Sequence, residues 1–296
     1  MKIRAPAKIN LRLRVVGKRK DGYHLLDTIM VPVSLYDEIE ITKAEGKERK
    51  RSSVRKLKVT CDHPLVPQGK RNLAYRAAAL LLAKSGADAR VSIHIHKEIP
   101  VGAGLGGGSS DAAAALVGLN RLLKLRLSTR KLEKLSLSLG ADVPFFIRPR
   151  PARARGIGER LSGLGKLPRL WAIILYPGFP VSTAWVYGKL QLTLTKPSAN
   201  TSINSLLRNA VGLRKLLVND LENVTLDRYP KVALLKARLT EEGAIGALMT
   251  GTGSSVFGIF DSRRKAKQAF HRLHKTNGAE AFLVRVLGRV GGSRIR

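Results

Sequence analysis

The stretch Pro100-Val101-Gly102-Ala103-Gly104-Leu105-Gly106-Gly107-Gly108-Ser109-Ser110-Asp111 decides how this chain is interpreted. Five of the seven residues from 102 to 108 are glycines, and an alanine-rich segment follows. Glycines let main-chain N–H groups approach an anion without a Cβ in the way. A helix behind them presents unpaired N–H groups and the positive end of its dipole. We expect that helix from about Ser109 to Leu123, with Ser109, Ser110 and Asp111 as caps. The pattern predicts a phosphate-binding loop in a nucleotide-using enzyme.

Other nucleotide motifs fit this loop less well. The spacing Gly102-x-Gly104-x-x-Gly107 matches the dinucleotide fingerprint, which also needs an acidic residue about 20 positions later. None lies around residues 125–127, and Pro100 breaks the tight turn from strand to loop. No Gly-Lys-Ser/Thr follows the glycines, so a Walker A loop is absent. The chain also lacks the His-Arg-Asp and Asp-Phe-Gly motifs of protein kinases.

Length and composition are those of an ordinary globular protein. The 296 residues suffice for two modest domains or one large one. The sequence has no apolar run long enough to span a membrane, and its first six residues lack the apolar core of a secretory signal. The single cysteine, Cys61, excludes an internal disulfide framework and a cysteine-based zinc site. We therefore expect a cytoplasmic protein without a membrane partner.

The formal net charge of +33 is unusually high. Such a charge is compatible with binding to nucleic acid or another polyanion. The densest basic run, Lys47 to Lys58, predicts a hairpin tip or loop. Aromatic residues make up only 5% of the chain and do not alternate with the charges, so base-stacking platforms are not evident. Charge alone does not favour nucleic acid as the partner, and a positive field would also steer a polyphosphate inward.

Hydrophobic patterns predict strands and helices that interleave along the chain. Strands are expected over residues 7–16, 25–33, 38–41, 57–61, 91–95, 154–161, 170–176, 247–249, 256–260 and 281–286. Helices are expected over residues 72–84, 109–123, 129–139, 206–217, 231–242 and 262–274. The Arg-Pro-Arg-Pro segment at 148–151 could form a hinge. The order lacks a strict βαβ rhythm, so we predict a two-layer α+β fold without internal repeats.

Further segments extend the pattern beyond the loop. The chain opens on Ala5-Pro6-Ala7-Lys8-Ile9-Asn10-Leu11 and carries a second glycine-rich turn, Thr250-Gly251-Thr252-Gly253-Ser254-Ser255. Together with the first loop, these segments resemble the GHMP small-molecule kinases. Asp21-Gly22-Tyr23-His24 and Leu139-Gly140-Ala141-Asp142-Val143-Pro144-Phe145 narrow the resemblance to members that act on cytidine-diphosphate methylerythritol. The resemblance spans nearly the whole chain.

This resemblance implies a two-domain kinase. A ribosomal-protein-like N-terminal domain, residues 1–155, would carry the ATP loop, and a ferredoxin-like C-terminal domain, residues 156–296, would close the cleft. The implied reaction transfers a phosphoryl group from ATP, with Mg²⁺, to the 2-hydroxyl of cytidine-diphosphate methylerythritol in the non-mevalonate isoprenoid pathway. One alternative is a GHMP kinase that acts on homoserine, mevalonate or a sugar. This alternative does not explain why the chain carries Tyr23-His24 and the motif at residues 139–144. The other is a basic nucleic-acid-binding protein on the ribosomal-like fold.

Two residues are implied to carry the chemistry. Asp142 would be the base that receives the hydroxyl proton, although by itself a turn aspartate can simply cap the next segment. Lys8 would keep that carboxylate ionised and stabilise the developing phosphate charge, although a lone lysine on a strand is usually solvated. Whether Asp142 abstracts the proton or only orients the hydroxyl is open for a loose transition state.

The remaining implied roles divide between the two substrates. His24 would bind the cytosine by hydrogen bonds, Tyr23 would stack on it, and Tyr187, with Trp185 as a competitor, would stack on its other side. Contacts to the rest of that substrate are expected from Asn10, Thr183, Gly251 and Gly253. ATP contacts are expected from residues 102–110 and the preceding Pro100 and Val101, with Asn72 and Lys97 near the adenine. Ser110 is a candidate ligand for magnesium.

No resident metal site is predicted. His94 and His96 lie two apart on a strand, hence on one face, which is a spacing that can bind a metal. A zinc site needs three or four ligands, and the sequence shows no third one. The expected oligomeric state is a monomer or a weak homodimer.

Overall fold

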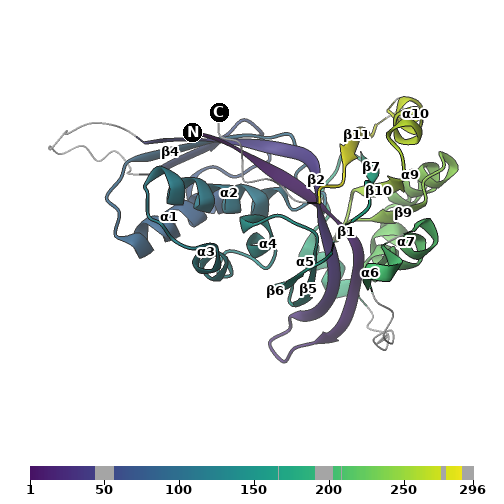
Figure 1. Ribbon diagram of the computed structural model, residues 1–296, viewed down its shortest axis with the longest axis horizontal. Coiled ribbons are helices and arrows are strands. Elements are labelled where there is room, and N and C mark those ends of the chain that lie inside the picture. Colours follow the sequence, from purple (N-terminus) through teal and green to yellow (C-terminus); the bar gives the residue numbers. More distant parts are fainter. Residues whose placement is uncertain (44–56, 166, 191–202, 208, 275–277, 289–296) are drawn as a thin grey trace.

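The computed structural model describes residues 1–43, 57–165, 167–190, 203–207, 209–274 and 278–288. The basic run from Lys47 to Lys58 therefore lies almost wholly outside the described residues. The described residues form a seven-stranded sheet, built mainly from the N-terminal half, and a four-stranded sheet from the C-terminal half. Helices cover one face of each sheet (Figure 1). The mixed α+β class predicted from the sequence is confirmed.

A long antiparallel ribbon organises the first sheet. It consists of β1 (Lys2–Lys18) and β2 (His24–Lys43), which cross the middle of the molecule (Figure 1). The other strands of this sheet are β3 (Leu57–Cys61), β4 (Val91–His96), β5 (Ala152–Gly156), β6 (Arg160–Gly163) and β8 (Val218–Asn219). The main path runs β3-β4-β2-β1-β8, and β5 pairs with both β2 and β6.

Strand β2 corrects one expectation, because residues 25–33 and 38–41 belong to a single strand. The irregularity lies in the register: Pro6 pairs with Tyr36, while the next residue, Ala7, pairs with Val33. The extra residues of β2 form a bulge there, which bends a strand without ending it. The ribbon can therefore continue from one half of the molecule into the other.

Helices pack on one face of the first sheet, and the glycine loop leads into one of them. They are α1 (Leu73–Ser85), α2 (Gly107–Leu122), α3 (Thr129–Ser136) and the short α4 (Val143–Ile147), with the 3-10 turn η1 (Gly69–Arg71). Helix α2 lies close against the ribbon, since a Cβ on Gly118 would come within 2.5 Å of Ile3 and 2.4 Å of Ile41. Helix α3 ends three residues earlier than expected, and α4 was not predicted.

The second sheet has the order β11-β7-β10-β9, and all its pairs are antiparallel. Its strands are β7 (Trp171–Tyr176), β9 (Gly246–Met249), β10 (Val256–Phe260) and β11 (Glu280–Arg285). The helices of this half are α5 (Thr183–Lys189), α6 (Ile203–Leu206), α7 (Ala210–Leu216), α8 (Glu222–Arg228), α9 (Pro230–Glu241) and α10 (Arg263–Leu273). This strand order, with helices α9 and α10 packed on the sheet, is ferredoxin-like as expected. The predicted helix over 206–217 is represented by α7, which begins only at Ala210.

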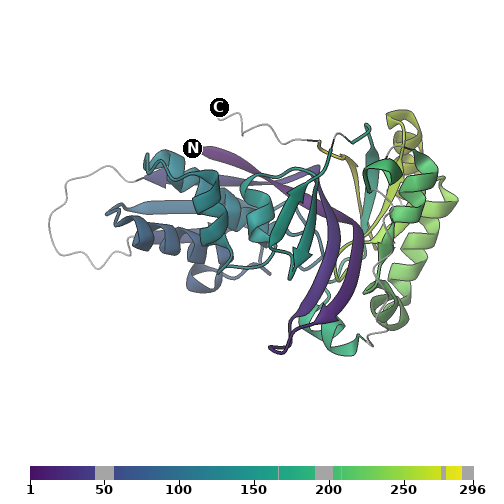
Figure 2. The same cartoon turned by 60° about the horizontal axis from the view of Figure 1, so that its bottom comes forward.

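The two sheets share a hydrophobic core. Ile9 and Val31 of the ribbon are fully buried in one cluster with Ile174 and Ile259 of the second sheet. Figure 2 shows the ribbon passing between the helices of the two halves. Because each half buries apolar surface against the other, the walls of any cleft between them are held in a fixed relation.

The proposed boundary between the two domains lies in the hairpin of strands β5 and β6. Residues 154–161 were expected to form one strand, but Gly156 and Gly158, at φ +76° and +116°, turn the chain into a β5–β6 hairpin. The division into residues 1–155 and 156–296 remains a proposal, and its boundary falls inside β5. Among the described residues, no helix is long and apolar enough to cross a bilayer.

Candidate active site

A cavity of about 940 Å³ lies between the two halves, and nearly all the residues singled out from the sequence line it. These are Lys8, Asn10, Tyr23, His24, Asn72, Lys97, Pro100 to Ser109, Asp142, Thr183, Tyr187 and Gly251. Ser110 and Gly253 do not line it. Its walls thus come from the ribbon, the glycine loop, the start of α4, α5 and the second glycine turn.

The glycine loop directs its carbonyl groups into the protein. The backbone N–H groups of Lys8, Val181 and Ser255 donate to the carbonyl oxygens of Leu105, Gly102 and Ala103 at 2.9, 3.1 and 3.2 Å. Within the described residues, the N–H groups of residues 102–106 have no hydrogen-bond acceptor. Free amides at the wall of a cavity are what a phosphate group requires.

Gly104 is held where no other residue fits. It adopts φ +77°, and a Cβ there would lie 2.1 Å from the carbonyl oxygen of Thr250. The first glycine loop and the second glycine turn therefore touch backbone to backbone.

We expect Gly104→Ala to lower the free energy of unfolding by about 1–3 kcal/mol, because alanine adds both left-handed strain and the clash with Thr250. Urea titration of the purified variant measures this change. Gly108→Ala is the matched control, since a Cβ on Gly108 meets nothing within 4 Å. Equal stability of the two variants would contradict the role given to Gly104.

Helix α2 starts earlier than expected, and its caps were predicted wrongly. It begins at Gly107, after Gly106 in the left-handed conformation, and no side chain caps it. Ser110 and Asp111 are therefore the fourth and fifth residues of the helix rather than caps, and they are 1% and 3% exposed. Ser110 Oγ and Asp111 Oδ1 are buried without a hydrogen-bond partner among the described residues. The helix N-terminus stays open toward the cavity, which favours an anion.

Lys97 forms buried ion pairs with two carboxylates. Its ammonium group pairs with Asp37 and, at 3.0 Å, with Asp111. Burial alone would lower the pKa of Lys97, but the two carboxylates raise it above its ordinary value. Burial raises the pKa of Asp111 to about 8, against the pull of Lys97. Asp37 and Asp111 were not predicted as members of the site, and only the packing of β2 against α2 brings them together.

Asn72 serves as the N-cap of helix α1. Its side chain accepts a hydrogen bond from the Ala74 N–H at 2.8 Å and donates to the Pro67 carbonyl at 3.0 Å. Both ends of the amide are therefore used within the protein. Asn72 still lines the cavity, where it fixes the start of α1 at the cavity wall.

Lys8 is a buried cation in the floor of the cavity and is only 3% exposed. Its Nζ donates to Asn10 Oδ1 at 2.5 Å and to the Gly104 carbonyl at 2.7 Å. An ammonium group has three donors, so one remains for a ligand. Burial lowers the pKa of Lys8, and the charge of Asp142 opposes that shift. A Cβ on Gly251 would lie 3.3 Å from Lys8 Nζ, so a residue without a side chain leaves this cation room.

Asp142 occupies the N-cap position of α4, yet its side chain accepts no hydrogen bond from that helix. The simple capping role considered from the sequence is therefore not what the structure shows. The carboxylate instead acts electrostatically on two cavity residues: its charge opposes the lowering of the pKa of Lys8 by burial and adds to the rise in the pKa of Tyr187 that burial causes. Asp142 and Lys8 thus line the same cavity.

Aromatic side chains form another part of the cavity wall. The rings of His24 and Tyr187 stack, with centroids 4.9 Å apart and planes 26° apart. Tyr23 is 61% exposed at the turn between β1 and β2. Trp185, the competitor of Tyr187, does not line the cavity and packs edge-on against Tyr229. Burial lowers the pKa of His24 and, with the charge of Asp142, raises that of Tyr187.

The second glycine turn contributes hydroxyl groups that were not assigned from the sequence. Thr250 Oγ1 accepts from the Asn10 N–H at 3.1 Å and donates to Asn10 Oδ1 and the Gly104 carbonyl, each at 3.3 Å. Thr252 Oγ1 lies 3.2 Å from Thr183 Oγ1. Thr28 Oγ1 accepts from Asn10 Nδ2 at 2.8 Å. These threonines carry no spacing signal, because their partners lie on other elements far away in the sequence.

Comparisons with known proteins agree with this geometry. Residues 72–149 match the family model described as GHMP kinases N terminal domain, and residues 202–279 match GHMP kinases C terminal. The 4-diphosphocytidyl-2-C-methyl-D-erythritol kinase of a Geobacter species is 48% identical over 97% of this chain and 99% of its own length. The enzyme of that name from Syntrophus aciditrophicus is 45% identical over 96% of this chain and 99% of its own.

Solved structures show the same fold. The crystal structure of a 4-(cytidine 5'-diphospho)-2C-methyl-D-erythritol kinase superposes with a TM-score of 0.80 at 35% identity, covering 98% of this chain and 100% of that one. A homoserine kinase from Cytophaga hutchinsonii has a TM-score of 0.73 at 18% identity, covering 98% and 95% of the two chains. The second likeness concerns the fold alone.

Proposed function

This chain belongs to the GHMP kinase family, and from that premise we propose how its cavity phosphorylates 4-diphosphocytidyl-2-C-methyl-D-erythritol. The enzyme is an ATP-dependent small-molecule kinase that yields the 2-phosphate of this substrate and ADP in the non-mevalonate isoprenoid pathway.

A series of contacts and charge interactions between cavity residues supports the assignment of roles. The glycine loop touches Lys8 through the Gly104 carbonyl, and Lys8 interacts with the charge of Asp142. Asp142 in turn acts on Tyr187, which stacks on His24. A phosphate site, a cation, a carboxylate and an aromatic pair therefore follow one another along the cavity. This is the order that ATP, the acceptor hydroxyl and the cytosine of the acceptor substrate require.

In the proposed reaction, free amides of the loop and the open N-terminus of α2 hold the triphosphate. Asp142 receives the proton of the 2-hydroxyl group, and the oxygen of that hydroxyl group forms a bond to the γ-phosphorus of ATP. The bond from that phosphorus to the β,γ-bridging oxygen breaks, and ADP leaves. Lys8 neutralises charge on the transferring group. Positioning and charge stabilisation of this kind supply most of the catalysis in phosphoryl transfer.

Magnesium enters this scheme as part of the ATP substrate. Hard cations of this kind take oxygen ligands. The unpartnered, buried Ser110 Oγ and Asp111 Oδ1 at the start of α2 fit that requirement, and we assign them to the ion that accompanies ATP. When bound, the ion neutralises phosphate charge.

The stacked pair of His24 and Tyr187 indicates where the cytosine base of the substrate binds. His24 covers one face of Tyr187, so a base stacked on that face displaces His24. We assign base recognition to His24, with Tyr23 free to close over the base from the exposed turn.

We expect His24→Ala to raise the KM for the cytidine substrate about tenfold or more, since base contacts of this type contribute about 1–3 kcal/mol. The KM for ATP should stay near the wild-type value. Steady-state kinetics with each substrate varied in turn measures both constants. Trp185→Ala is the matched control, because this aromatic residue of α5 lies outside the cavity. An effect confined to ATP would contradict the assignment of His24.

The direct test of function is a coupled ADP-release assay with 4-diphosphocytidyl-2-C-methyl-D-erythritol as acceptor. Homoserine and mevalonate serve as comparison acceptors. ADP release that depends on the cytidine substrate supports the proposal. Equal or faster turnover of either comparison acceptor would reject it in favour of another small-molecule kinase.

A further inference from the structure

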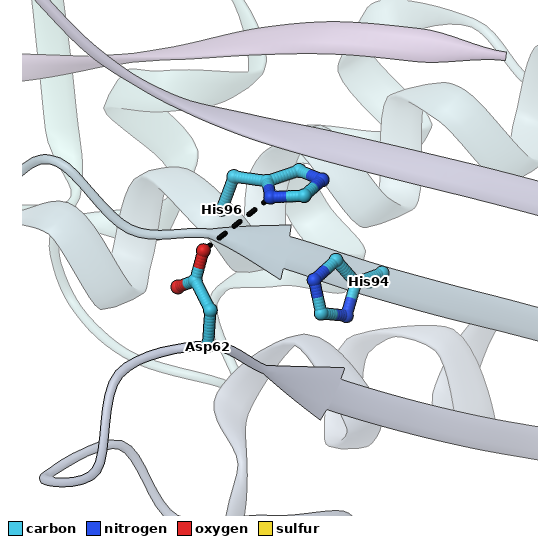
Figure 3. A group of neighbouring side chains, drawn as sticks. All are labelled: Asp62, His94 and His96. Carbon is cyan, nitrogen blue, oxygen red and sulfur yellow. Dashed lines mark ion pairs between the residues drawn. The ribbon is translucent and has the colours of Figure 1, made fainter.

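A group of metal-ligating side chains lies on the opposite face of the first sheet from helices α1 and α2. On β4, His94 and His96 alternate with Ile93 and Ile95, which are fully buried on the helical side. The parallel neighbour β3 pairs Cys61 with Ile95, so the next residue, Asp62, lies beside His96. Figure 3 shows the two rings and the carboxylate turned toward one another. None of the three residues lines the active-site cavity.

The ligand atoms are close enough to share one ion. One ligand atom from each of the three residues lies within 4.8 Å of the others. His96 Nδ1 is 3.3 Å from Asp62 Oδ2, and the rings of His94 and His96 have centroids 4.5 Å apart. Zinc bound tetrahedrally at 2.0–2.1 Å places its ligands about 3.3 Å apart. Small side-chain rotations therefore suffice to close the site.

Two further contacts orient the ligands. Thr60 Oγ1 is 2.8 Å from His94 Nδ1, which leaves Nε2 of that ring for an ion. The Lys97 N–H donates to Asp62 Oδ1 at 2.9 Å, which leaves Oδ2 facing His96. Metal-binding histidines and carboxylates are commonly fixed by hydrogen bonds of this kind through their second polar atom.

Carboxylates lie beside both histidines, although the chain as a whole is strongly basic. Strand β2 pairs Glu38 with His96 and Glu40 with His94, and paired residues of adjacent strands share a face of the sheet. Lys2 binds Glu38 at 2.7 Å and also pairs in register with Glu40, so Asp62 supplies the carboxylate that faces His96 directly, at 3.3 Å. The two histidines lie between these carboxylates.

We propose that Asp62, His94 and His96 form a binding site for a divalent transition-metal ion of the zinc class, with water in the remaining coordination positions. Two histidines and one carboxylate with open positions are a ligand set used for zinc and for other first-row metals. The ion links β3, a short strand at the edge of the sheet, to β4. Binding to the folded state alone stabilises that state by mass action.

Isothermal titration of the metal-free protein with ZnCl₂, without nucleotide, tests the site. We expect saturable binding of one ion and a rise of the thermal unfolding midpoint that EDTA reverses. His94→Gln and Asp62→Asn should each weaken zinc binding at least about tenfold, because even loss of an outer-shell partner costs that much. His271→Gln is the control, since His271 and His274 form a second histidine pair on α10. Unchanged affinity in both test variants, or loss of binding in the His271 variant, would overturn the proposal.

Two further measurements test the site, one on the wild-type protein and one that also reports whether the His94→Gln variant is folded. Absorption of the wild-type protein with Co²⁺ reports nitrogen and oxygen coordination directly, and absence of a saturable Co²⁺ spectrum would also reject the site. Kinase turnover of His94→Gln should equal that of the wild type, because His94 lies outside the cavity. Loss of zinc binding with full turnover separates this site from the proposed active site.

Discussion

Asp142→Asn should lower kcat by about a hundredfold to ten-thousandfold, the usual range for removing a general base. Asparagine keeps the shape of the side chain but cannot take the hydroxyl proton. Because Asp142 accepts no capping hydrogen bond from α4, the substitution removes no contact within that helix. The thermal unfolding midpoint and the affinity for ATP should therefore stay close to the wild-type values.

Single-turnover kinetics separates loss of chemistry from loss of binding in this variant. Calorimetry with a non-hydrolysable ATP analogue measures the nucleotide affinity. Asp261→Asn is the control, since this carboxylate is exposed and paired with Lys265 at 3.1 Å, away from the cavity. Turnover of Asp142→Asn at the wild-type rate would remove Asp142 from the role of base. A slow rate accompanied by lost ATP binding would show instead that the residue shapes the nucleotide site.

Lys8→Met should lower kcat by about a hundredfold to a thousandfold, as expected when a donor aimed at transition-state charge is removed. Methionine fills most of the volume of the lysine stem without its charge. The acceptors that Lys8 leaves behind, Asn10 Oδ1 and the Gly104 carbonyl, still receive a hydrogen bond from Thr250 Oγ1. Burying an ammonium group costs free energy of desolvation, and its removal offsets part of the loss of its two hydrogen bonds, so we expect only a small change in the unfolding midpoint.

Two further variants sharpen the test of Lys8. Lys8→Arg retains the charge but enlarges the head group, and Gly251 leaves little room, since a Cβ there would already be 3.3 Å from Lys8 Nζ. We expect it to be nearly as slow as Lys8→Met, which would show that placement of the charge matters. Lys265→Met, at an exposed ion pair on α10, should behave as the wild type. Full activity of Lys8→Met would exclude a role for this cation in the reaction.

Local sequence patterns predicted most of the regular elements. The strands around Ile9 and Ile93 follow from alternating apolar residues, and the strand around Phe257 follows from a short, nearly continuous apolar run that is buried throughout. Helix α1 was predicted within one residue at each end, because its alanine- and leucine-rich segment contains no Gly or Pro. In the structure Asn72 is its N-cap, and Gly86 ends it in the left-handed conformation. The errors arose where local signals were ambiguous. A bulge in β2 resembled a break, and the hairpin of β5 and β6 resembled one strand.

The sequence by itself determined the glycine loop, which depends on residue type and spacing along the chain. The resemblance of its motifs to the GHMP kinases singled out Lys8, Asp142 and the aromatic residues Tyr23, His24 and Tyr187. Only the tertiary structure decided which groups meet. It placed Lys97 between Asp37 and Asp111, stacked His24 on Tyr187, and joined Thr250 to Asn10. It also supplied Asp62 as the missing third partner of His94 and His96. The physical reason is that strand pairing and shared burial bring together residues far apart in the sequence, and no short-range pattern records such pairs.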